Sequence, residues 1–365
     1  MVFDFIDGGS FAEQTLRRNV EDFGSLRLRQ RVLCGGSAPE LSIELLGQRL
    51  PMPLLLAPVG MAGLLARRGE IQAARAARKA GIPFCLSTVS VCSIEEVAHQ
   101  AGTPPWFQLY MLRDRGWMKA MLDRAAAAGA RTLVFTVDLA VPGIRYRDFR
   151  SGFAAEPSWE RTIRRLVGGA THPGWVWDVL VRGRPLGFGN LSGTHNNQRS
   201  FAAFWSWIRS NFDPTATWAD IEWLRASWSG PIVLKGILDS GDALQAVTCG
   251  ADAVIVSNHG GRQLDDVVSS IRALPRIVDA VDGRLPVLLD GGIRSGLDML
   301  KALALGAKAC LVGRPWAYAL AAGGEGAVAH LIEILRQELT TALTLSGCTD
   351  LTSVAGSLDL YNRDT

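Results

Sequence analysis

Residues 251–265 read Ala-Asp-Ala-Val-Ile-Val-Ser-Asn-His-Gly-Gly-Arg-Gln-Leu-Asp and pass from an apolar run into a polar turn that contains glycine. The apolar part carries one charge, Asp252, which is typical of a strand buried in a parallel sheet. Such a strand leaves the side chains that follow it at the rim of a sheet or barrel, so His259 and Arg262 can both face a ligand. An imidazole can act as a base near neutral pH, and a guanidinium can bind a carboxylate through two hydrogen bonds. The stretch therefore predicts an enzyme that acts on a small carboxylic acid.

The same change from apolar run to polar turn recurs along the chain. From residue 51 onward, short apolar runs alternate with longer helical patterns, and many of the helical segments end at a glycine suited to a left-handed C-cap, such as Gly81, Gly129 and Gly306. Eight strands alternating with helices predict an α/β fold, a (β/α)8 TIM barrel, as one domain over residues 1–365. A doubly wound open sheet is the alternative, although no Gly-x-Gly-x-x-Gly follows an early strand to support it. The candidate strands are 54–57, 83–86, 106–109, 132–137, 232–235, 253–256, 287–290 and 309–312.

The composition excludes several classes of protein. Hydrophobic residues make up 48% and charged residues 20%, which excludes wholesale disorder, and a net charge of +3 is too small to indicate a nucleic-acid partner. The six cysteines include no Cys-x-x-Cys pair, which predicts free thiols in a reducing cytoplasm. No group of residues has the spacing of a metal site, so we predict no metal. The longest apolar run, 51–66, contains three prolines and two glycines, so we expect no segment that crosses a membrane.

One connection in this pattern is unusually long. Residues 139–216 separate the fourth predicted strand from the next helix, and long connections on this side of a barrel tend to be functional. Eight of the eleven tryptophans lie between Trp159 and Trp228, and six arginines stand against one acidic residue, Asp178, between Arg161 and Arg199. We predict a lid over the barrel. Its tryptophans either contact the headgroups of an anionic membrane or pack against the barrel.

Ligands of a (β/α)8 barrel bind at the carboxyl ends of the strands. Two of these ends predict a phosphate site. Residues 290–294 (Asp-Gly-Gly-Ile-Arg) follow the seventh strand, and residues 313–315 (Gly-Arg-Pro) follow the eighth. Glycine lets backbone N–H groups approach an anion and arginine neutralises it. Polar residues at the other ends are Ser87, Thr88, Gln108, Tyr110, Thr136, Asp138 and Lys235.

Residues 257–265, 290–294 and 301–315 resemble the FMN-dependent α-hydroxy-acid dehydrogenase and oxidase family. Residues 16–22, 87–92 and 106–110 are most similar to its branch of bacterial respiratory L-lactate dehydrogenases. The resemblance covers nearly the whole chain. It implies an FMN-dependent enzyme that oxidises an L-2-hydroxy acid, foremost L-lactate to pyruvate, and passes the electrons through the flavin to a quinone-type acceptor. It also implies a homotetramer. From the tryptophans and arginines of the long connection we expect peripheral attachment to the cytoplasmic face of a membrane.

The resemblance also assigns roles to individual residues. His259 would be the base, Asp138 the carboxylate that orients it, and Tyr110 a hydrogen-bond partner of the reacting hydroxyl. Arg262 and Arg145 would bind the substrate carboxylate. The cofactor would be held by residues at seven of the eight strand ends: Pro58, Val59, Gly60, Ser87, Gln108, Thr136 and Lys235 at the flavin ring, and Asp290, Gly291, Gly292, Arg294, Gly313 and Arg314 at the ribityl phosphate.

Phe5 departs from the family pattern, because it stands where the family usually has a tyrosine that helps to bind the substrate carboxylate. Relatives also carry a further helical segment before the residues that correspond to the start of this sequence. Gly60 stands where oxidases of the family tend to have alanine, which favours a quinone over O2 as acceptor. Two alternatives remain open: a 2-hydroxy-acid oxidase or mandelate-type dehydrogenase on the same scaffold, and an FMN-binding accessory or redox protein with little catalysis.

Overall fold

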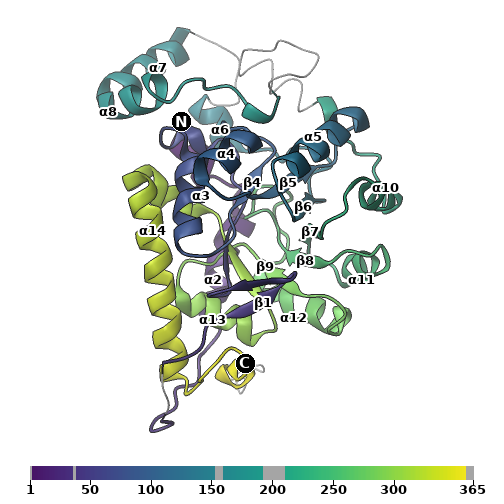
Figure 1. Cartoon of the computed structure of the whole chain (residues 1–365). Helices are drawn as coiled ribbons and strands as arrows, with labels where there is room; N and C mark the ends of the chain where they lie inside the picture. The colour runs from purple at the N-terminus through teal and green to yellow at the C-terminus, as the bar shows by residue number, and fades with distance from the viewer. Residues whose placement is uncertain (1, 36–37, 153–158, 192–209, 359–365) are drawn as a thin grey trace.

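Eight parallel strands form the centre of the computed structural model, which describes residues 2–35, 38–152, 159–191 and 210–358 (Figure 1). In spatial order the strands run β3, β10, β9, β8, β7, β6, β5 and β4. A parallel bridge between Leu56 and Phe84 joins the two outermost strands and closes the barrel. The strands are β3 (Leu54–Leu56), β4 (Cys85–Ser87), β5 (Trp106–Tyr110), β6 (Leu133–Thr136), β7 (Ile232–Ile237), β8 (Ala253–Val256), β9 (Val287–Leu289) and β10 (Ala309–Val312).

Each predicted strand overlaps one of these eight, so the predicted fold class is confirmed. Helices follow the strands and pack outside them. They are α3 (Gly69–Lys79), α4 (Ile94–Ala101), α5 (Arg115–Ala127), α10 (Ala219–Ser227), α11 (Ser240–Thr248), α12 (Ser270–Val281), α13 (Gly296–Ala304) and α14 (Arg314–Leu345).

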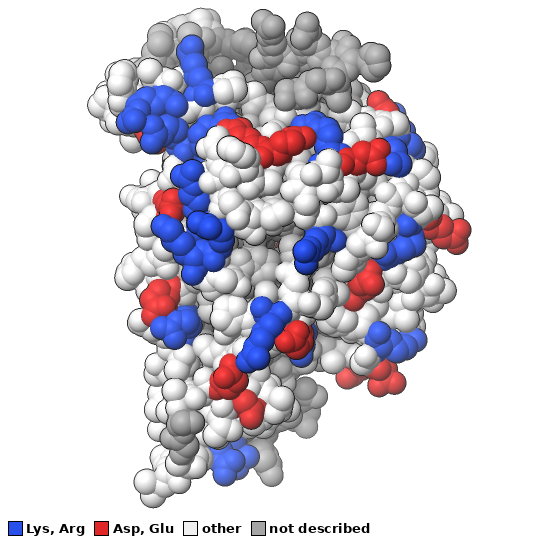
Figure 2. All heavy atoms as spheres, in the orientation of Figure 1, with Lys and Arg blue, Asp and Glu red and all other residues white. Residues whose placement is uncertain are grey.

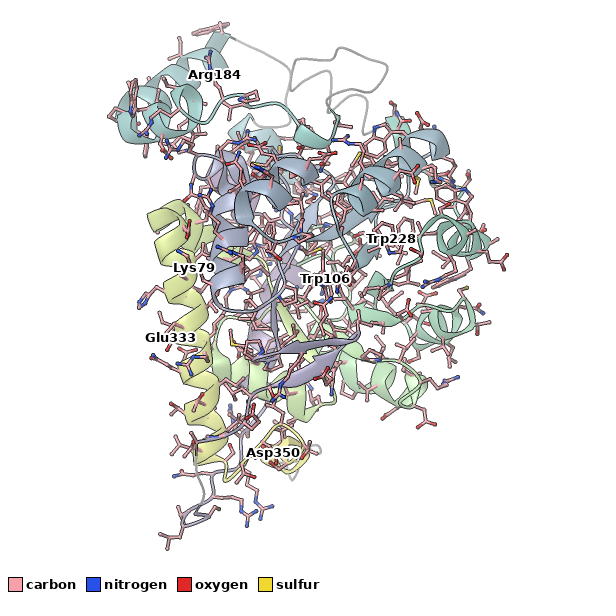
Figure 3. The ribbon with its side chains drawn as sticks, viewed as in Figure 1. Lys79, Trp106, Arg184, Trp228, Glu333 and Asp350 are labelled. Atoms are coloured by element: carbon pink, nitrogen blue, oxygen red, sulfur yellow. The ribbon has the colours of Figure 1, made fainter. Side chains whose placement is uncertain are left out.

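The strand residues are buried on both faces, as expected of a parallel barrel. One set of side chains, including Leu55, Trp106 and Val233, fills the interior, and Trp106 is labelled in Figure 3. An antiparallel hairpin of β1 (Ile43–Leu45) and β2 (Gln48–Leu50) adds its apolar side chains to the same cluster. The hairpin stands before the first barrel strand, at the amino ends of the strands. A ligand must therefore approach from the carboxyl ends.

Two helices that precede the barrel pack beside those carboxyl ends. α1 (Val2–Asp7) contacts α14 and α6 (Tyr146–Ser151), and α2 (Gln14–Ser25) contacts α12. The side chains of Asn19 and Asn258 exchange two buried hydrogen bonds of 2.8 and 2.7 Å. The amino-terminal segment is thereby attached to the turn that follows β8.

The connection between β6 and α10, residues 139–216, is called the insertion below. It contains α6, α7 (Trp159–Thr171), α8 (Pro173–Trp175), the π-helix η2 (Val176–Val181) and the 3-10 helix η3 (Gly189–Leu191). Figure 1 shows α7 and α8 at the top of the molecule, apart from the helices around the barrel, and Arg184 marks this part of the chain in Figure 3. Among the described residues no helix is both long and apolar enough to span a bilayer.

The tryptophans of this region fall into two groups. Trp228 is buried, Trp218 and Trp223 pack partly against the core, and the half-buried Trp175 donates to the carbonyl of Leu64, so these four fit the packing alternative. Trp159 and Trp177 are 73% and 60% exposed, which fits contact with another surface. Trp205 and Trp207, also within the predicted lid, lie outside the described residues. The lid itself stays a prediction.

Gly292 tests how tightly α2 packs on the turn after β9. It has a φ of +93°, and a Cβ added there would lie 1.9 Å from the carbonyl oxygen of Asn19. Gly250 also has a positive φ, +72°, but a Cβ there would meet nothing within 4 Å. We expect Gly250→Ala to destabilise the fold by about 1–2 kcal/mol, the cost of a left-handed alanine. Gly292→Ala should cost about 1–3 kcal/mol more because α2 must move. Urea unfolding followed by tryptophan fluorescence measures both, and equal losses would contradict this packing.

Candidate active site

The turn after β8 directs His259 toward the neighbouring strands. His259, Gly260 and Gly261 all have positive φ values, of 58°, 64° and 73°. Two glycines adopt this conformation easily, whereas histidine does so at a cost of about 1–3 kcal/mol that the surrounding structure must offset. The buried Oγ of Ser257 accepts a hydrogen bond of 3.0 Å from the backbone N–H of His259. A strained, well-supported histidine at a strand end is typical of a functional site.

His259 pairs with Asp138, which follows β6. Nδ1 of the imidazole lies 2.8 Å from Oδ1 of Asp138. Gly236 makes room for the carboxylate, since a Cβ there would lie 2.6 Å from the Cβ of Asp138. The second oxygen, Oδ2, is buried and has no hydrogen-bond partner in the part of the chain that the structure describes. The pairing of Nδ1 makes Nε2 the nitrogen that can take a proton from a substrate.

The pKa of His259 lies below its ordinary value because burial disfavours the imidazolium more than Asp138 favours it. A neighbouring carboxylate on its own raises the proton affinity of an imidazole. The contribution of Asp138 has that sign, but burial decides the net direction. Burial also acts to raise the pKa of Asp138, yet His259 and Lys235 bring it below its ordinary value. A neutral imidazole beside an ionised carboxylate is the state required of a general base.

Lys235, on β7, lies beneath this pair. Its Nζ lies 2.8 Å from Oγ of Ser257 and 2.9 Å from Oδ2 of Asp290, and all three residues are buried. Burial acts to lower the pKa of Lys235, but Asp290 and Asp138 raise it above its ordinary value. The ammonium therefore stays charged. The other oxygen of Asp290, Oδ1, is buried and makes no hydrogen bond to any described residue.

Gln108, on β5, is oriented by residues that follow β4. Its Oε1 accepts hydrogen bonds from Oγ of Ser87 at 3.1 Å and from the N–H of Thr88 at 3.3 Å. These bonds identify the other amide atom, Nε2, as the donor. Nε2 is buried and has no acceptor within the described chain. The site thus presents a buried N–H2 group to an acceptor that the protein itself does not supply.

The predicted residues after β3 and β6 border the same region. Residues 58–60 follow β3, and the N–H of Met61 donates to the carbonyl of Val89 at 2.9 Å. A Cβ at Gly60 would lie 2.7 Å from the side chain of Val89, so alanine there requires that side chain to move. Thr136 is the buried last residue of β6.

The predicted phosphate site is assembled next to α1. The guanidinium of Arg314 donates hydrogen bonds to the carbonyls of Ile6, Gly260 and Gly8 at 3.1, 2.9 and 2.9 Å. Burial, followed by the nearby charge of Arg294, lowers the pKa of Arg314 to about 10. Arg314 at the first turn of α14 and Arg294 just before α13 are close in space and favour an anion between them.

The glycines of this site have a structural role as well as the predicted one. Gly291 and Gly292 have φ values of +91° and +93°, and Gly292 touches the backbone of α2. Glycine is therefore required at position 292 by close packing, whatever approaches its N–H group. Gly313 directly precedes α14 and has space around its Cα.

The two predicted substrate arginines lie together with Tyr110. Arg262 donates to the carbonyls of Phe5 at 2.6 Å and Gly8 at 2.7 Å, and its guanidinium lies 5.0 Å from the centre of the Phe5 ring. Burial, and then the charge of Arg145, lower the pKa of Arg262. Burial, and then Asp138, raise the pKa of Tyr110, which stays a protonated donor. Position 5 thus offers an aromatic face to the arginine where a tyrosine would also offer a hydroxyl.

Sequence reasoning missed two residues of this region. Asp148 is buried beside Arg145, with Oδ2 of the carboxylate 3.7 Å from Nη1 of the arginine. The sequence signal for this pair is that Asp148 stands three residues after Arg145, where a helix would bring the two side chains together. Asn190 lies within the insertion and bonds to the turn after β4. No pattern of neighbouring residues signalled that contact.

Comparison with known proteins agrees with this geometry. A mandelate oxidase solved with (S)-4-hydroxymandelic acid superposes with a TM-score of 0.83 at 40% identity, covering 98% of this chain and 93% of that one. The monotopic membrane protein (S)-mandelate dehydrogenase has a TM-score of 0.90 at 38% identity, with 98% and 94% covered. The family model described as FMN-dependent dehydrogenase matches residues 1–359. The chain belongs to the FMN-dependent dehydrogenase family.

Two members of the family whose sequences are similar to this chain are both named L-lactate dehydrogenase. The L-lactate dehydrogenase of Ectopseudomonas mendocina (strain ymp) is 53% identical over 362 residues, which cover 99% of this chain and 95% of the relative. That of Caulobacter vibrioides (strain NA1000 / CB15N) is 53% identical over 353 residues, with 97% and 91% covered. The protein is thus an FMN-dependent oxidoreductase.

The residues at the strand ends fit FMN. The buried donor on Gln108 suits a ring that carries carbonyl acceptors, and the unpartnered oxygen of Asp290 suits a hydroxyl of the ribityl chain. Arg294 and Arg314 suit the phosphate. No group of His, Cys, Asp and Glu among the described residues could hold a metal ion.

The pKa of His259 is measurable in the unliganded enzyme. We expect it below about 6.5, the value of a free histidine, because the imidazole is buried. Asp138→Asn should lower it further, since the charge that favours the imidazolium is removed. Titration of 13C-labelled histidine by NMR reports this, with His259 assigned by its loss from the five-histidine spectrum in His259→Gln. A pKa that rises in Asp138→Asn would contradict the direct pairing.

Proposed function

We propose that this protein oxidises L-lactate to pyruvate with His259 as base. The observation that carries the proposal is the half-buried Asp138–His259 pair, 2.8 Å apart, placed beside two arginines and a tyrosine. The L-lactate dehydrogenase name of relatives at 53% identity supports the choice of substrate.

The side chains of the site divide the work on a 2-hydroxy acid. Arg262 and Arg145 bind the carboxylate and hold the substrate in one orientation, and Tyr110 donates a hydrogen bond at the reacting hydroxyl. His259 takes the proton that leaves the substrate, whether from oxygen or from carbon, and Asp138 stabilises the imidazolium. When bound, FMN supplies the acceptor for the two electrons. The positive charge of Lys235 would stabilise the negative charge that arrives with them.

Arg262 must exchange partners to do this. It now donates to the carbonyls of Phe5 and Gly8, which are neutral acceptors. A substrate carboxylate is a stronger acceptor, and hydrogen bonds to a charged group contribute about 1.5–3 kcal/mol against about 1 kcal/mol for neutral ones. With phenylalanine at position 5, carboxylate binding rests on Arg262 and Arg145.

The acceptor that we propose is a membrane quinone, reached by peripheral attachment to the cytoplasmic face of a membrane. Trp159, Ile163 and Val167 are exposed at spacings of four residues on α7, which places them on one face of that helix. Trp177 and Val181 of η2 are also exposed. Figure 2 shows basic side chains at this end of the visible face, with acidic ones among them. Apolar side chains beside basic ones suit an anionic bilayer surface. We also propose that the chain acts as a homotetramer.

A second substrate class has specific support. The solved structures that superpose well are a mandelate oxidase and an (S)-mandelate dehydrogenase. The alternative substrate to test is therefore an L-2-hydroxy acid with an aromatic side chain. The alternative electron acceptor is O2. An accessory protein that binds FMN without oxidising a substrate is the alternative of another class.

Anaerobic mixing of the FMN-loaded protein with L-lactate tests the proposed reaction. We expect the visible absorption of the flavin to bleach, and His259→Gln to slow the bleaching at least about 100-fold while FMN stays bound. A panel of L- and D-2-hydroxy acids, mandelate included, ranks the substrates. If no acid bleaches the flavin, the enzymatic proposal fails. Reoxidation by O2 as fast as by a soluble quinone would overturn the proposed acceptor.

Membrane attachment predicts a loss of vesicle binding in Trp159→Ser/Trp177→Ser. We expect at least about tenfold weaker co-sedimentation with phosphatidylglycerol vesicles, because two large apolar side chains no longer enter the interface. Leu244→Ser/Leu297→Ser is the control, since both leucines are exposed but lie on helices around the barrel. Equal binding by wild type and the tryptophan variant would contradict this surface.

A further inference from the structure

The insertion reaches the flavin site through one fully buried side chain. Asn190, in η3, is 0% exposed. Its Oδ1 accepts a hydrogen bond of 2.9 Å from the N–H of Ile94, at the first residue of α4. Its Nδ2 lies 3.3 Å from the carbonyl oxygen of Ser87, 3.2 Å from that of Thr88 and 3.0 Å from Oγ of Ser90. Both polar atoms of the amide are thus used to hold the turn between β4 and α4.

The backbone beside Asn190 makes the same contact. The N–H of Gly189 donates to the carbonyls of Ser90 and Val91 at 3.2 and 3.1 Å. A Cβ at Gly189 would lie 2.1 Å from the backbone nitrogen of Ser93, so only glycine allows this approach. Two stretches almost 100 residues apart in the sequence therefore pack backbone against backbone, and the position of one determines that of the other.

The contact continues to Gln108. Thr88, whose carbonyl accepts from Asn190, donates from its own Oγ1 to the carbonyl of Gln108 at 2.5 Å. Ser87, the other carbonyl partner, donates from Oγ to Oε1 of Gln108. The two residues held by Asn190 are thus the two that orient Gln108, whose buried Nε2 faces the site without a partner among the described residues.

We propose that Asn190 is a positioning residue of the FMN site. It acts through Ser87 and Thr88, holding the end of β4 so that Gln108 presents its N–H2 group to the flavin ring. Without Asn190, two buried carbonyls lose a donor, and the turn must shift to recover one. The proposal rests on the binding of FMN at the barrel mouth and not on the identity of the substrate.

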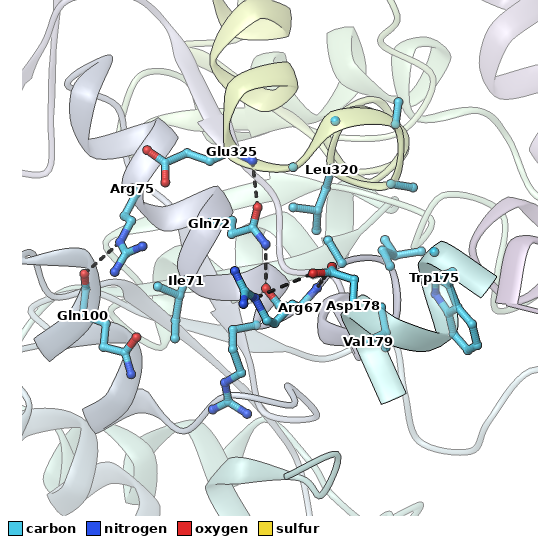
Figure 4. A pocket seen from close by; sticks show the side chains of 18 residues that line it. Arg67, Ile71, Gln72, Arg75, Gln100, Trp175, Asp178, Val179, Leu320 and Glu325 are labelled. Atoms are coloured by element: carbon cyan, nitrogen blue, oxygen red, sulfur yellow. Dashed lines mark hydrogen bonds and ion pairs between the residues drawn. The ribbon is translucent and has the colours of Figure 1, made fainter. Parts of the chain in front are cut away.

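A second attachment of the insertion provides the control. The indole Nε1 of Trp175 donates to the carbonyl of Leu64 at 2.8 Å, and Oδ2 of Asp178 accepts from the N–H of Arg67 at 3.0 Å. Figure 4 shows Trp175, Asp178 and Arg67 around a pocket between the insertion, α3 and α14. This attachment joins the insertion to residues that follow β3. Neither of these two bonds is made to Ser87, Thr88 or Gln108.

The affinity for FMN separates the two attachments. Apoprotein of wild type, Asn190→Ala and Trp175→Phe is titrated with FMN, and quenching of flavin fluorescence reports the dissociation constant. We expect at least about tenfold weaker binding in Asn190→Ala, equivalent to the loss of about 1.4 kcal/mol. Trp175→Phe, which loses a hydrogen bond of the insertion elsewhere, should change the affinity less than about twofold. Equal FMN affinity of wild type and Asn190→Ala overturns the proposal.

Thr88→Val keeps the test decisive if Asn190→Ala also lowers the stability of the apoprotein. Valine matches threonine in shape but removes the bond from Oγ1 to the carbonyl of Gln108, while the backbone N–H at position 88 still donates to Oε1. If Asn190 acts through Thr88, the fold loss of FMN affinity in the double variant Asn190→Ala/Thr88→Val should be smaller than the product of the losses in the two single variants. Multiplicative effects would show that Asn190 stabilises the fold only. FMN titration requires no substrate, so a protein that shows this coupling but is not bleached by L-lactate would refute the proposed reaction alone.

Discussion

The half-buried pair of Asp138 and His259 is the interaction on which the rest of the site depends. A carboxylate with little exposure to solvent requires nearby positive charge, and Lys235 on the strand between them supplies it. Lys235 also forms an ion pair with Asp290. The charges of four groups at the ends of consecutive strands, β6 to β9, therefore depend on one another: Asp138, Lys235, His259 and Asp290. Gly236 leaves space for the carboxylate, and the left-handed turn at His259 directs the imidazole to it. A change at any of these positions alters the proton affinity of the base.

The two ends of the barrel differ in polarity. At the amino ends of the strands, the β1–β2 hairpin adds apolar side chains to the interior. At the carboxyl ends, several buried polar atoms remain without protein partners among the described residues, on Gln108, Asp138 and Asp290. Unsatisfied buried groups are costly in a folded protein unless a ligand pairs with them. The polar end is therefore the part of the barrel whose stability depends on what binds there.

Much of this arrangement was predictable from the sequence. The strand ends were identified because apolar runs stop at polar residues, and a closed barrel brings such ends together whatever their order. Contacts between distant segments were not predictable. The use of the Phe5 and Gly8 carbonyls by Arg262 and the burial that lowers the pKa of His259 depend on where α1 and the loops pack. The bonds of Asn190 were missed because they join an irregular segment to a turn, and neither has a periodic pattern.

The amino-terminal helix has a consequence for the order of folding. Arg262 bonds to a residue 257 positions earlier, and Arg314 bonds to one 308 positions earlier. The first and last barrel strands, β3 and β10, also pair directly. During synthesis, α1 leaves the ribosome first, and its contacts with α6, Arg262 and Arg314 are complete only when residue 314 has followed. The site therefore forms in one late step, and a nascent chain that lacks β10 has neither a closed barrel nor a complete anion site.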